Sequence, residues 1–242
     1  MTPTTVTILT SPISSDNDLH ARLNLVRQGI SAACAAAGRS DDEITLIVVT
    51  KFHPVSLVRG LISLGVSDFG ESRHQEAEPK ATALTDQPIT WHFVGQVQTK
   101  KARRVSRYAR VIHSVDRRSL LDALRVAESD EPQPDTEIFL QLNLTDDPLR
   151  GGVSDRDLES LAEHALDTPG VRVRGVMAVA PRDGDPARAF EQLHAASQRV
   201  QALDPSASAI SAGMSGDYPA AIEWGATHLR IGSAITAKTP ER

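Results

Sequence analysis

The chain has 242 residues, of which 40% are hydrophobic and 24% charged, a composition typical of a globular protein with a substantial core. Its net charge of -5 gives no general attraction to nucleic acid or to anionic membranes. The single cysteine, Cys34, excludes an internal disulfide and any metal site made of several cysteines. Because no apolar stretch approaches the roughly 20 residues of a membrane span, we expect a cytoplasmic protein without a membrane partner.

The first residues differ in composition from the remainder of the chain. Residues 1–14 are rich in Thr, Ser and Pro and lack the basic segment and long apolar core of a secretory signal. We therefore expect a loose leader over 1–14 and one domain over 15–242. The domain should begin with a helix over about 16–37, because apolar residues recur on one helical face until Gly38.

Eight apolar runs follow this helix, and most are separated by helical patterns. The runs predicted as strands lie near 44–50, 66–69, 89–94, 110–114, 136–143, 171–178, 207–212 and 227–231. One helix is expected to begin with Pro54 as its first residue and to end at Gly65. Another covers about 185–203, and Pro79 is expected to kink or split a helix that starts at Glu71.

This alternation predicts the fold class. Strands that alternate with helices pair in parallel through right-handed crossovers. Eight strands and eight helices in about 250 residues fit an α/β protein with a single (β/α)8 TIM-type barrel that begins on an N-terminal helix. The alternative is an open doubly wound sheet, but the G-x-G-x-x-G turn expected after its first strand is missing.

Polar residues stand where several predicted strands end. Lys51 directly follows the apolar run "LIVVT", and Gly- and Ser-rich turns at 213–216 and 232–233 follow the last two strands. In a (β/α)8 barrel the strand C-termini face the active site, and phosphate commonly binds after the last two strands. With Arg230 nearby, this set suits a phosphorylated aldehyde held as a Schiff base, and pyridoxal 5′-phosphate is the obvious candidate.

Other signals are weaker. His92 lies within a predicted strand, where a histidine is more often a hydrogen-bonded core residue than a catalyst. The basic run "KKARRVSRYAR" at 100–110 allows an RNA-binding or phosphate-binding module, but a solvated helix face explains it as well. The histidines show no H-E-x-x-H or comparable spacing, so we expect no metal.

Five ordered motifs extend this interpretation. "VVTKFHP", "FGESRHQEAEPK", "WHFVGQVQTKK", "RGVMAVAP" and "GMSGDYPAAIEWGATHLRIGSAI" together resemble the YggS/PROSC family of pyridoxal phosphate homeostasis proteins, over residues 16 to 235. The resemblance implies a barrel similar to the N-terminal domain of alanine racemase. It implies pyridoxal phosphate on Lys51, phosphate-binding turns that contain Met214 and Ser215 and also Gly232 and Ser233, and Arg230 facing the pyridine nitrogen.

The sequence departs from the family pattern at a few positions. Ser72 replaces the asparagine of the usual "GEN", which affects the positioning of the cofactor ring. Arg150 stands where the family often has lysine, and Ser233 replaces a frequent threonine but keeps the hydroxyl. The full expected cofactor-binding set is Lys51, Ser72, His92, Met214, Ser215, Arg230, Gly232 and Ser233, with no catalytic residue among them.

The resemblance and the strand-end residues predict a function in homeostasis of intracellular pyridoxal phosphate. The protein is expected to hold the cofactor on Lys51 without efficient turnover, as a carrier or regulator and not an enzyme. Its partners would be pyridoxal phosphate and the apo-enzymes that receive it, with no nucleic acid, and we expect a monomer. The alternative is an amino acid racemase-like enzyme that uses the same cofactor.

Overall fold

A computed structural model describes residues 15–125, 135–145, 147 and 150–236. The predicted leader over residues 1–14 lies outside this part of the chain. So do the acidic and proline-rich residues 126–134 and the last six residues, 237–242. Among the described residues, no helix combines the length and apolar character needed to cross a bilayer.

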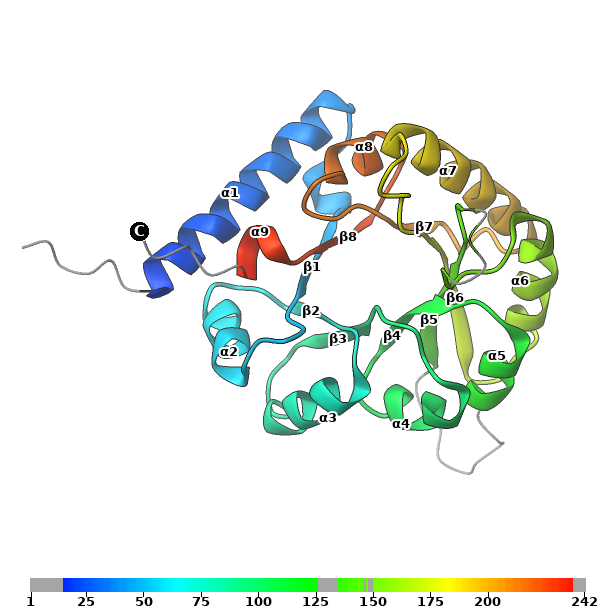
Figure 1. Cartoon of the computed structure of the whole chain (residues 1–242), viewed down its shortest axis with the longest axis horizontal. Coiled ribbons are helices and arrows are strands. Elements are labelled where there is room, and N and C mark those ends of the chain that lie inside the picture. Colours follow the sequence, from blue (N-terminus) through cyan, green and yellow to red (C-terminus); the bar gives the residue numbers. More distant parts are fainter. Residues whose placement is uncertain (1–14, 126–134, 146, 148–149, 237–242) are drawn as a thin grey trace, which may run out of the picture.

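The eight strands are all parallel and close into a barrel in chain order (Figure 1). They are β1 (Thr45–Val49), β2 (Asp68–Glu71), β3 (Thr90–Phe93), β4 (Val111–Val115), β5 (Thr136–Gln141), β6 (Val171–Met177), β7 (Ala209–Ser211) and β8 (His228–Ile231). The closing pair joins β1 to β8, with Ile47 opposite Arg230 and Val48 opposite Ile231. The predicted fold class is therefore confirmed.

Helices surround the barrel on its outside (Figure 1). They are α1 (Ser15–Ala36), α2 (Val55–Ser63), α3 (His74–Ala83), α4 (Ala102–Ser106), α5 (Arg118–Leu124), α6 (Leu158–Leu166), α7 (Pro186–Leu203), α8 (Tyr218–Glu223) and the short α9 (Ser233–Thr236). Helix α1 precedes the first strand, as predicted, and its apolar face is buried through Leu19, Leu23, Val26 and Ile30.

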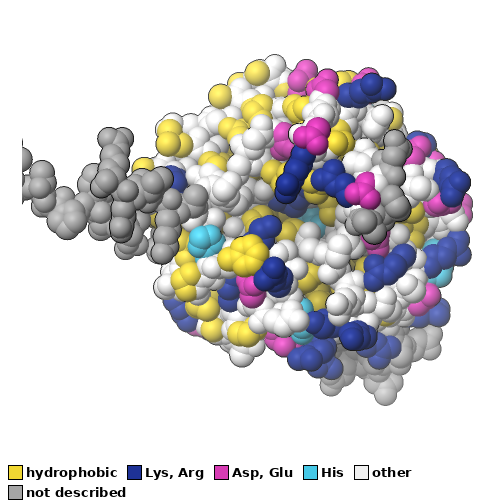
Figure 2. Space-filling model, in the orientation of Figure 1, with side chains coloured by type: hydrophobic (Ala, Val, Ile, Leu, Met, Phe, Trp, Pro, Cys, Tyr) yellow, Lys and Arg dark blue, Asp and Glu magenta, His cyan; other side chains and the backbone are white. Residues whose placement is uncertain are grey.

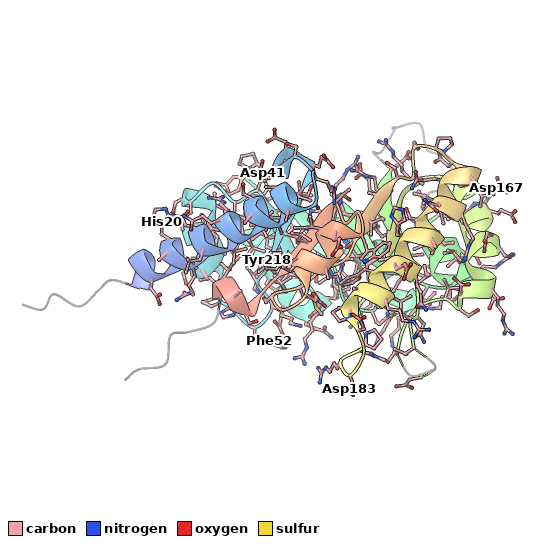
Figure 3. The ribbon with its side chains drawn as sticks, turned by 90° about the horizontal axis from the view of Figure 1, so that it is seen from above. His20, Asp41, Phe52, Asp167, Asp183 and Tyr218 are labelled. Carbon is pink, nitrogen blue, oxygen red and sulfur yellow. The ribbon has the colours of Figure 1, made fainter. Side chains whose placement is uncertain are left out.

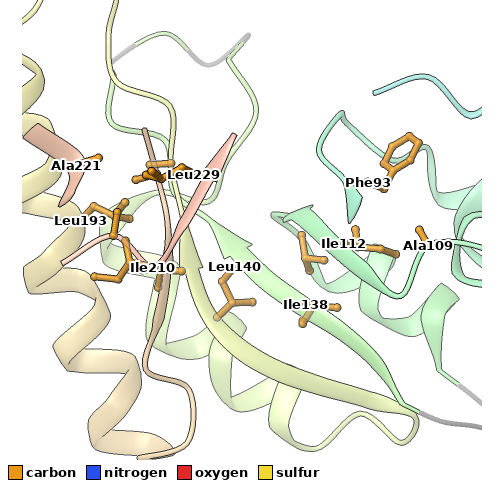
Figure 4. Packing of buried hydrophobic residues seen from close by; sticks show 14 of the residues in the cluster. Phe93, Ala109, Ile112, Ile138, Leu140, Leu193, Ile210, Ala221 and Leu229 are labelled. Atoms are coloured by element: carbon orange, nitrogen blue, oxygen red, sulfur yellow. The ribbon is translucent and has the colours of Figure 1, made fainter. Parts of the chain in front are cut away.

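The main hydrophobic core lies between the strands and the helices. Successive side chains of a strand point to opposite faces, so every second residue faces outward to the helices. Leu193 of α7, Ile210 of β7 and Leu229 of β8 belong to this layer and gather in Figure 4. Their burial fixes the helices on the barrel and thereby fixes the direction of every strand.

The inside of the barrel is different in character. A small apolar cluster of Val111, Phe139, Met177 and Ala209 lies apart from the outer core. Buried polar side chains accompany it, namely His92, His113, Ser211, His228 and Arg230. Many barrels of this class fill the interior with Val, Ile and Leu, whereas this interior carries hydrogen-bonding groups from one end toward the other.

Three local predictions need correction. β2 was expected at 66–69 but spans Asp68–Glu71, and α3 consequently begins at His74 and not at Glu71. Helix α3 also continues without interruption through Pro79, so the helix is not split there. Pro54 is the N-cap of α2, and Val55 is the first helical residue.

The parallel strands give the barrel two chemically distinct ends. Figure 3 shows Phe52 and Asp183, which follow β1 and β6, at one end of the molecule. Asp41 and Asp167, which precede β1 and β6, lie at the opposite end in the same view. The loops after the strands therefore meet at one rim, where Lys51 and both Gly- and Ser-rich turns are located.

Candidate functional site

Lys51 continues the inward-facing row of β1 to the rim of the barrel. Ile47 and Val49 lie beside Gly70 of β2, and Lys51 follows them with the same two-residue period. The Lys51 side chain is exposed. In the end-on view of Figure 2, Lys and Arg side chains border the centre of the barrel. The amine is therefore open to solutes that approach from this end.

A buried polar group fixes the backbone just before Lys51. Lys80 of α3 donates from Nζ to the carbonyl oxygen of Thr50 at 2.9 Å and to Glu71 Oε1 at 2.6 Å. Thr50 Oγ1 donates to the same carboxylate oxygen at 2.8 Å. Burial raises the pKa of Glu71, although the hydrogen bond and charge of Lys80 act in the opposite direction.

A second residue of α3 fixes the backbone just after Lys51. The backbone N–H of Phe52 donates to Glu76 Oε2 at 2.8 Å. Phe52 has a φ of 68°, a left-handed conformation that side chains other than glycine seldom adopt. Glu76 and Lys80 are four residues apart and therefore share one face of α3. Together, Lys80 and Glu76 fix the backbone on both sides of Lys51, at Thr50 and at Phe52.

The loops after β7 and β8 bring two hydroxyl groups together. Ser233 Oγ lies 3.4 Å from Ser215 Oγ, and the N–H of Ala234 donates to Ser215 Oγ at 3.3 Å. Gly213 has a φ of 89°, and a Cβ there would approach Ala221 Cβ to 2.8 Å. Glycine is thus required for the turn that carries Ser215 across to the start of α9.

This turn has donors that the protein itself does not use. Within the described residues, no acceptor is found for the backbone N–H groups of Ser215 and Gly216. A Cβ on Gly216 would meet no atom within 4 Å, so the turn is open on that side. The N–H of Met214 is different, because it donates to Asp217 Oδ1 at 2.6 Å. Gly232 lies against Val49 of β1, so Ser233, the first residue of α9, follows the strand that neighbours β1.

Arg230 is a buried cation inside the barrel, with only 6% of its surface exposed. Its guanidinium donates to Ser211 Oγ at 2.6 Å and to the carbonyl oxygen of Ala178 at 2.9 Å. No carboxylate of the described residues lies within ion-pair distance of it. Burial lowers the pKa of Arg230 to about 10, so it remains protonated at neutral pH. Three of its five N–H donors have no partner among these contacts.

Two other predicted site residues, His92 and Ser72, belong to β3 and to the loop after β2. His92 is buried in β3 and contacts Asp68 and His113, each at 2.9 Å. Ser72 is half-buried after β2, and its carbonyl oxygen would lie 2.2 Å from a Cβ on Gly95. It borders a small hollow between the loops after β2 and β3. Neither residue has a recorded contact with Lys51, Ser215 or Ser233.

The basic run at 100–110 does not form one continuous helix. A 3-10 turn over Thr99–Lys101 is followed by α4, which ends at Ser106. Arg104 is paired with Glu78 of α3 at 2.9 Å. In the described part of the chain, no group of three or more His, Cys, Asp or Glu side chains is arranged to hold a metal ion.

Sequence reasoning did not single out several residues of this arrangement. Glu71 and Lys80 are ordinary charged residues in the sequence, and only the packing of α3 on β2 brings them to the Lys51 turn. His113 and Ser211 carried a usable signal, because both fall on the inward-facing period of their strands.

The donor set fits a phosphorylated aldehyde. Two hydroxyls and two unused backbone N–H groups converge where an anion is favoured, at a turn that only glycine allows. A lysine amine stands at the end of the adjacent strand, and a buried arginine without a carboxylate partner faces the barrel interior. These are the groups that would bind the phosphate, the aldehyde and the ring nitrogen of pyridoxal phosphate.

Comparison with known proteins agrees with this chemistry. The family model for the alanine racemase N-terminal domain matches residues 22–240. The pyridoxal phosphate homeostasis protein of Corynebacterium glutamicum is 36% identical over 217 residues, which cover 87% of this chain and 97% of the relative. The protein of the same name from Escherichia coli K12 is 34% identical over 225 residues, covering 90% and 96%.

Solved structures show the same barrel. PipY of Synechococcus elongatus PCC7942, solved with PLP bound, matches with a TM-score of 0.74 and 29% identity, covering 90% of this chain and 99% of PipY. Alanine racemase from Corynebacterium glutamicum shares the fold, with a TM-score of 0.65 and 14% identity over 90% of this chain and 61% of the racemase. The chain belongs to the family of pyridoxal phosphate homeostasis proteins, built on the barrel of the alanine racemase N-terminal domain.

Proposed function

We propose that this protein binds pyridoxal 5′-phosphate, holds it as a Schiff base on Lys51, and serves its homeostasis without efficient turnover of amino acids. The main support is that Lys51 follows β1 while the Ser233 and Ser215 hydroxyls, 3.4 Å apart, follow the neighbouring β8 and the next strand, β7. The names of its relatives and the PLP-bound structure of PipY support the same ligand.

Each of these residues would bind a different part of the cofactor. Lys51 would supply the amine that condenses with the aldehyde of the cofactor, and the carbonyl oxygen would leave as water. Ser215 and Ser233 bind the phosphate, with the N–H groups of the 213–216 turn. Arg230 donates toward the ring nitrogen, because a guanidinium has no acceptor to offer.

Solvent exposure of Lys51 suits a carrier. An exposed rim lets the aldehyde enter and leave, and reversal of the same imine formation by water returns the cofactor intact. Such a protein would keep a reactive aldehyde in a protected form and pass it to apo-enzymes that require it. We expect it to act as a monomer in the cytoplasm.

The racemase-like alternative has one observation in its favour, namely the fold shared with alanine racemase. It is disfavoured by Arg230. A donor at the ring nitrogen leaves that nitrogen without a proton, and an unprotonated ring is a weak acceptor of carbanion electrons. Racemases of similar fold tolerate an arginine at this place, so the two functions must be separated by measurement.

The covalent link is tested by Lys51→Ala. The variant should lose the visible absorbance of the Schiff base and should retain no cofactor after borohydride reduction, because no amine remains at this rim position. Lys100→Ala, which removes another exposed lysine, is the matched control and should behave like the wild type. Covalent trapping that persists in Lys51→Ala would contradict the assignment of Lys51.

The phosphate site is tested by Ser215→Ala and Ser233→Ala. Each hydroxyl should contribute a hydrogen bond to a charged group, about 1.5–3 kcal/mol, so each variant should bind pyridoxal phosphate about tenfold to a hundredfold more weakly. Titration followed by absorbance measures the affinity, and exposed Ser56→Ala serves as the control. Unphosphorylated pyridoxal should bind far more weakly than the phosphate ester. Equal affinity for the two compounds would rule out a phosphate site here.

The lack of turnover is tested with the loaded wild-type protein. It is incubated with L- and D-alanine and a panel of other amino acids, while racemisation, decarboxylation and keto-acid release are followed. We expect rates far below about one per second, the low end of typical enzymes. An alanine racemase assayed in parallel confirms that the assay detects activity. Turnover at or above that rate would favour the racemase-like alternative over the carrier.

A further inference from the structure

A continuous row of hydrogen bonds crosses the barrel interior behind Arg230. Arg230 contacts Ser211 Oγ at 2.6 Å, and Ser211 Oγ contacts His113 Nδ1 at 2.8 Å. His113 Nε2 contacts His92 Nδ1 at 2.9 Å, and His92 Nε2 contacts Asp68 Oδ1 at 2.9 Å. The row begins at a cation on β8 and ends at a carboxylate at the start of β2.

With both imidazoles neutral, the two ends of the row decide the position of every proton in it. Arg230 can only donate, so Ser211 Oγ accepts from it and is free to donate its own proton to His113 Nδ1. His113 then carries its proton on Nε2 and donates to His92 Nδ1. His92 in turn carries its proton on Nε2 and donates to Asp68, which as a carboxylate can only accept.

The opposite orientation fails at one end. If His113 carried its proton on Nδ1, neutral His92 would have to donate from Nδ1 and would present a lone pair to the Asp68 carboxylate. Two acceptors 2.9 Å apart without a proton between them are unfavourable. Burial of Asp68 opposes its ionisation, but hydrogen bonds from His92 and Ser67 outweigh this effect and lower its pKa. Burial, with the nearby charge of Arg230, keeps the pKa of His113 well below its usual value, so His113 is neutral.

The surroundings leave these side chains no other arrangement. His113 is fully buried and stacks on Phe139, with ring centroids 4.5 Å apart and an interplanar angle of 17°. His92 is also buried, and His228 packs against Phe139 from another side. Ser211 is one of only two protein acceptors recorded for the Arg230 guanidinium in the described part of the chain. The orientation of the Ser211 hydroxyl therefore affects the direction in which the remaining N–H groups of Arg230 point.

We propose that Ser211, His113, His92 and Asp68 form a positioning relay that fixes the Arg230 guanidinium toward the ligand in the barrel mouth. The relay connects the Arg230 cation to the Asp68 carboxylate through three neutral side chains. Each of the three accepts a hydrogen bond from the Arg230 side and donates one toward Asp68. It extends the functional site from the Lys51 rim to the opposite end of the barrel. For the identity of the ligand, and only for that, the inference rests on the proposed function.

The proton positions can be measured without any ligand. Imidazole ¹⁵N chemical shifts of the ligand-free protein, labelled at histidine, distinguish the two tautomers and the charged form. His113 and His92 should both be neutral with the proton on Nε2 at pH 7, and His113→Asn and His92→Asn assign their signals. A proton on Nδ1 of either ring, or a charged ring, would overturn the relay.

A pair of substitutions at His113 separates positioning from packing. In His113→Asn the amide oxygen can accept from Ser211 in place of Nδ1, whereas His113→Leu removes the acceptor but fills the space with an apolar group. Loss of one hydrogen bond should weaken pyridoxal phosphate binding about threefold to tenfold in His113→Leu. His113→Asn should recover most of that loss. If His113 served packing alone, leucine would be the better replacement, and that order would overturn the proposal.

A third variant covers the case in which His113→Leu does not fold. Ser211→Ala removes the hydrogen bonds of Ser211 to both His113 and Arg230 with a smaller change in volume, and it should weaken pyridoxal phosphate binding at least about threefold. Wild-type affinity in Ser211→Ala would overturn the relay. If the wild-type protein itself fails to bind pyridoxal phosphate, the proposed function fails, while the tautomers of the ligand-free protein still decide the relay.

Discussion

The pairing of β1 with β8 closes the barrel, and the arrangement of the site depends on that closure. It aligns Ile47 with Arg230 and Val48 with Ile231, so the two strands leave the barrel side by side. Because the strands are parallel, the residues that follow them, Lys51 and Ser233, meet at the same rim. Residues separated by more than 180 positions in sequence thereby become neighbours. In an open sheet β1 and β8 would lie at separate positions, and Lys51 would not come to the same rim as Ser233.

Closure also creates an interior that can hold a charge. Moving an arginine out of water costs several kcal/mol, and no nearby carboxylate offsets this cost for Arg230 in the described residues. The hydrogen bonds to Ser211 and Ala178 offset part of it, and an electron-rich ligand atom would offset more. The protein therefore holds a buried cation that a ligand can contact. The free energy for this burial comes from the apolar side chains buried in the outer layer.

Two lysines near the rim, Lys80 and Lys51, differ in burial and in their partners. Lys80 is buried and committed to Thr50 and Glu71, whereas Lys51 is exposed and unengaged by any carboxylate among the described residues. Lys80 fixes the turn, and the turn places Lys51 at the rim of the barrel. Phe52 completes the turn in a left-handed conformation; the residue is 63% exposed, and the Arg73 guanidinium lies 4.7 Å from the centroid of its ring.

Much of the fold and the rim of the site could be predicted, because both follow from short-range patterns. Apolar runs that alternate with amphipathic helices specify the barrel, and its strand ends point to Lys51, Ser215, Arg230 and Ser233. β2 was displaced in the prediction because it continues over Gly70 and Glu71, residues that strands usually disfavour. These residues are held in the strand by their ladder pairs with β1 and β3, and Glu71 also bonds to Lys80 of α3, a contact between residues on different elements.

The interior of the site was harder to predict, because its contacts also join residues that belong to different elements. A single buried histidine such as His92 has no sequence signature that separates a ligand contact from a core hydrogen bond. Its partners, Asp68 and His113, come from two other strands, and only the register of the closed barrel shows that they form one row.

We propose that Lys51 is the residue that holds pyridoxal phosphate, and a peptide map of the loaded protein can identify the modified lysine. The chain has five lysines, Lys51, Lys80, Lys100, Lys101 and Lys238, so a covalent adduct has few alternative positions. The wild-type protein is loaded with the cofactor, reduced with borohydride, digested and analysed by mass spectrometry. We expect the reduced cofactor on the peptide that contains Lys51. An unmodified Lys51, with the adduct on any of the other four lysines, would contradict it.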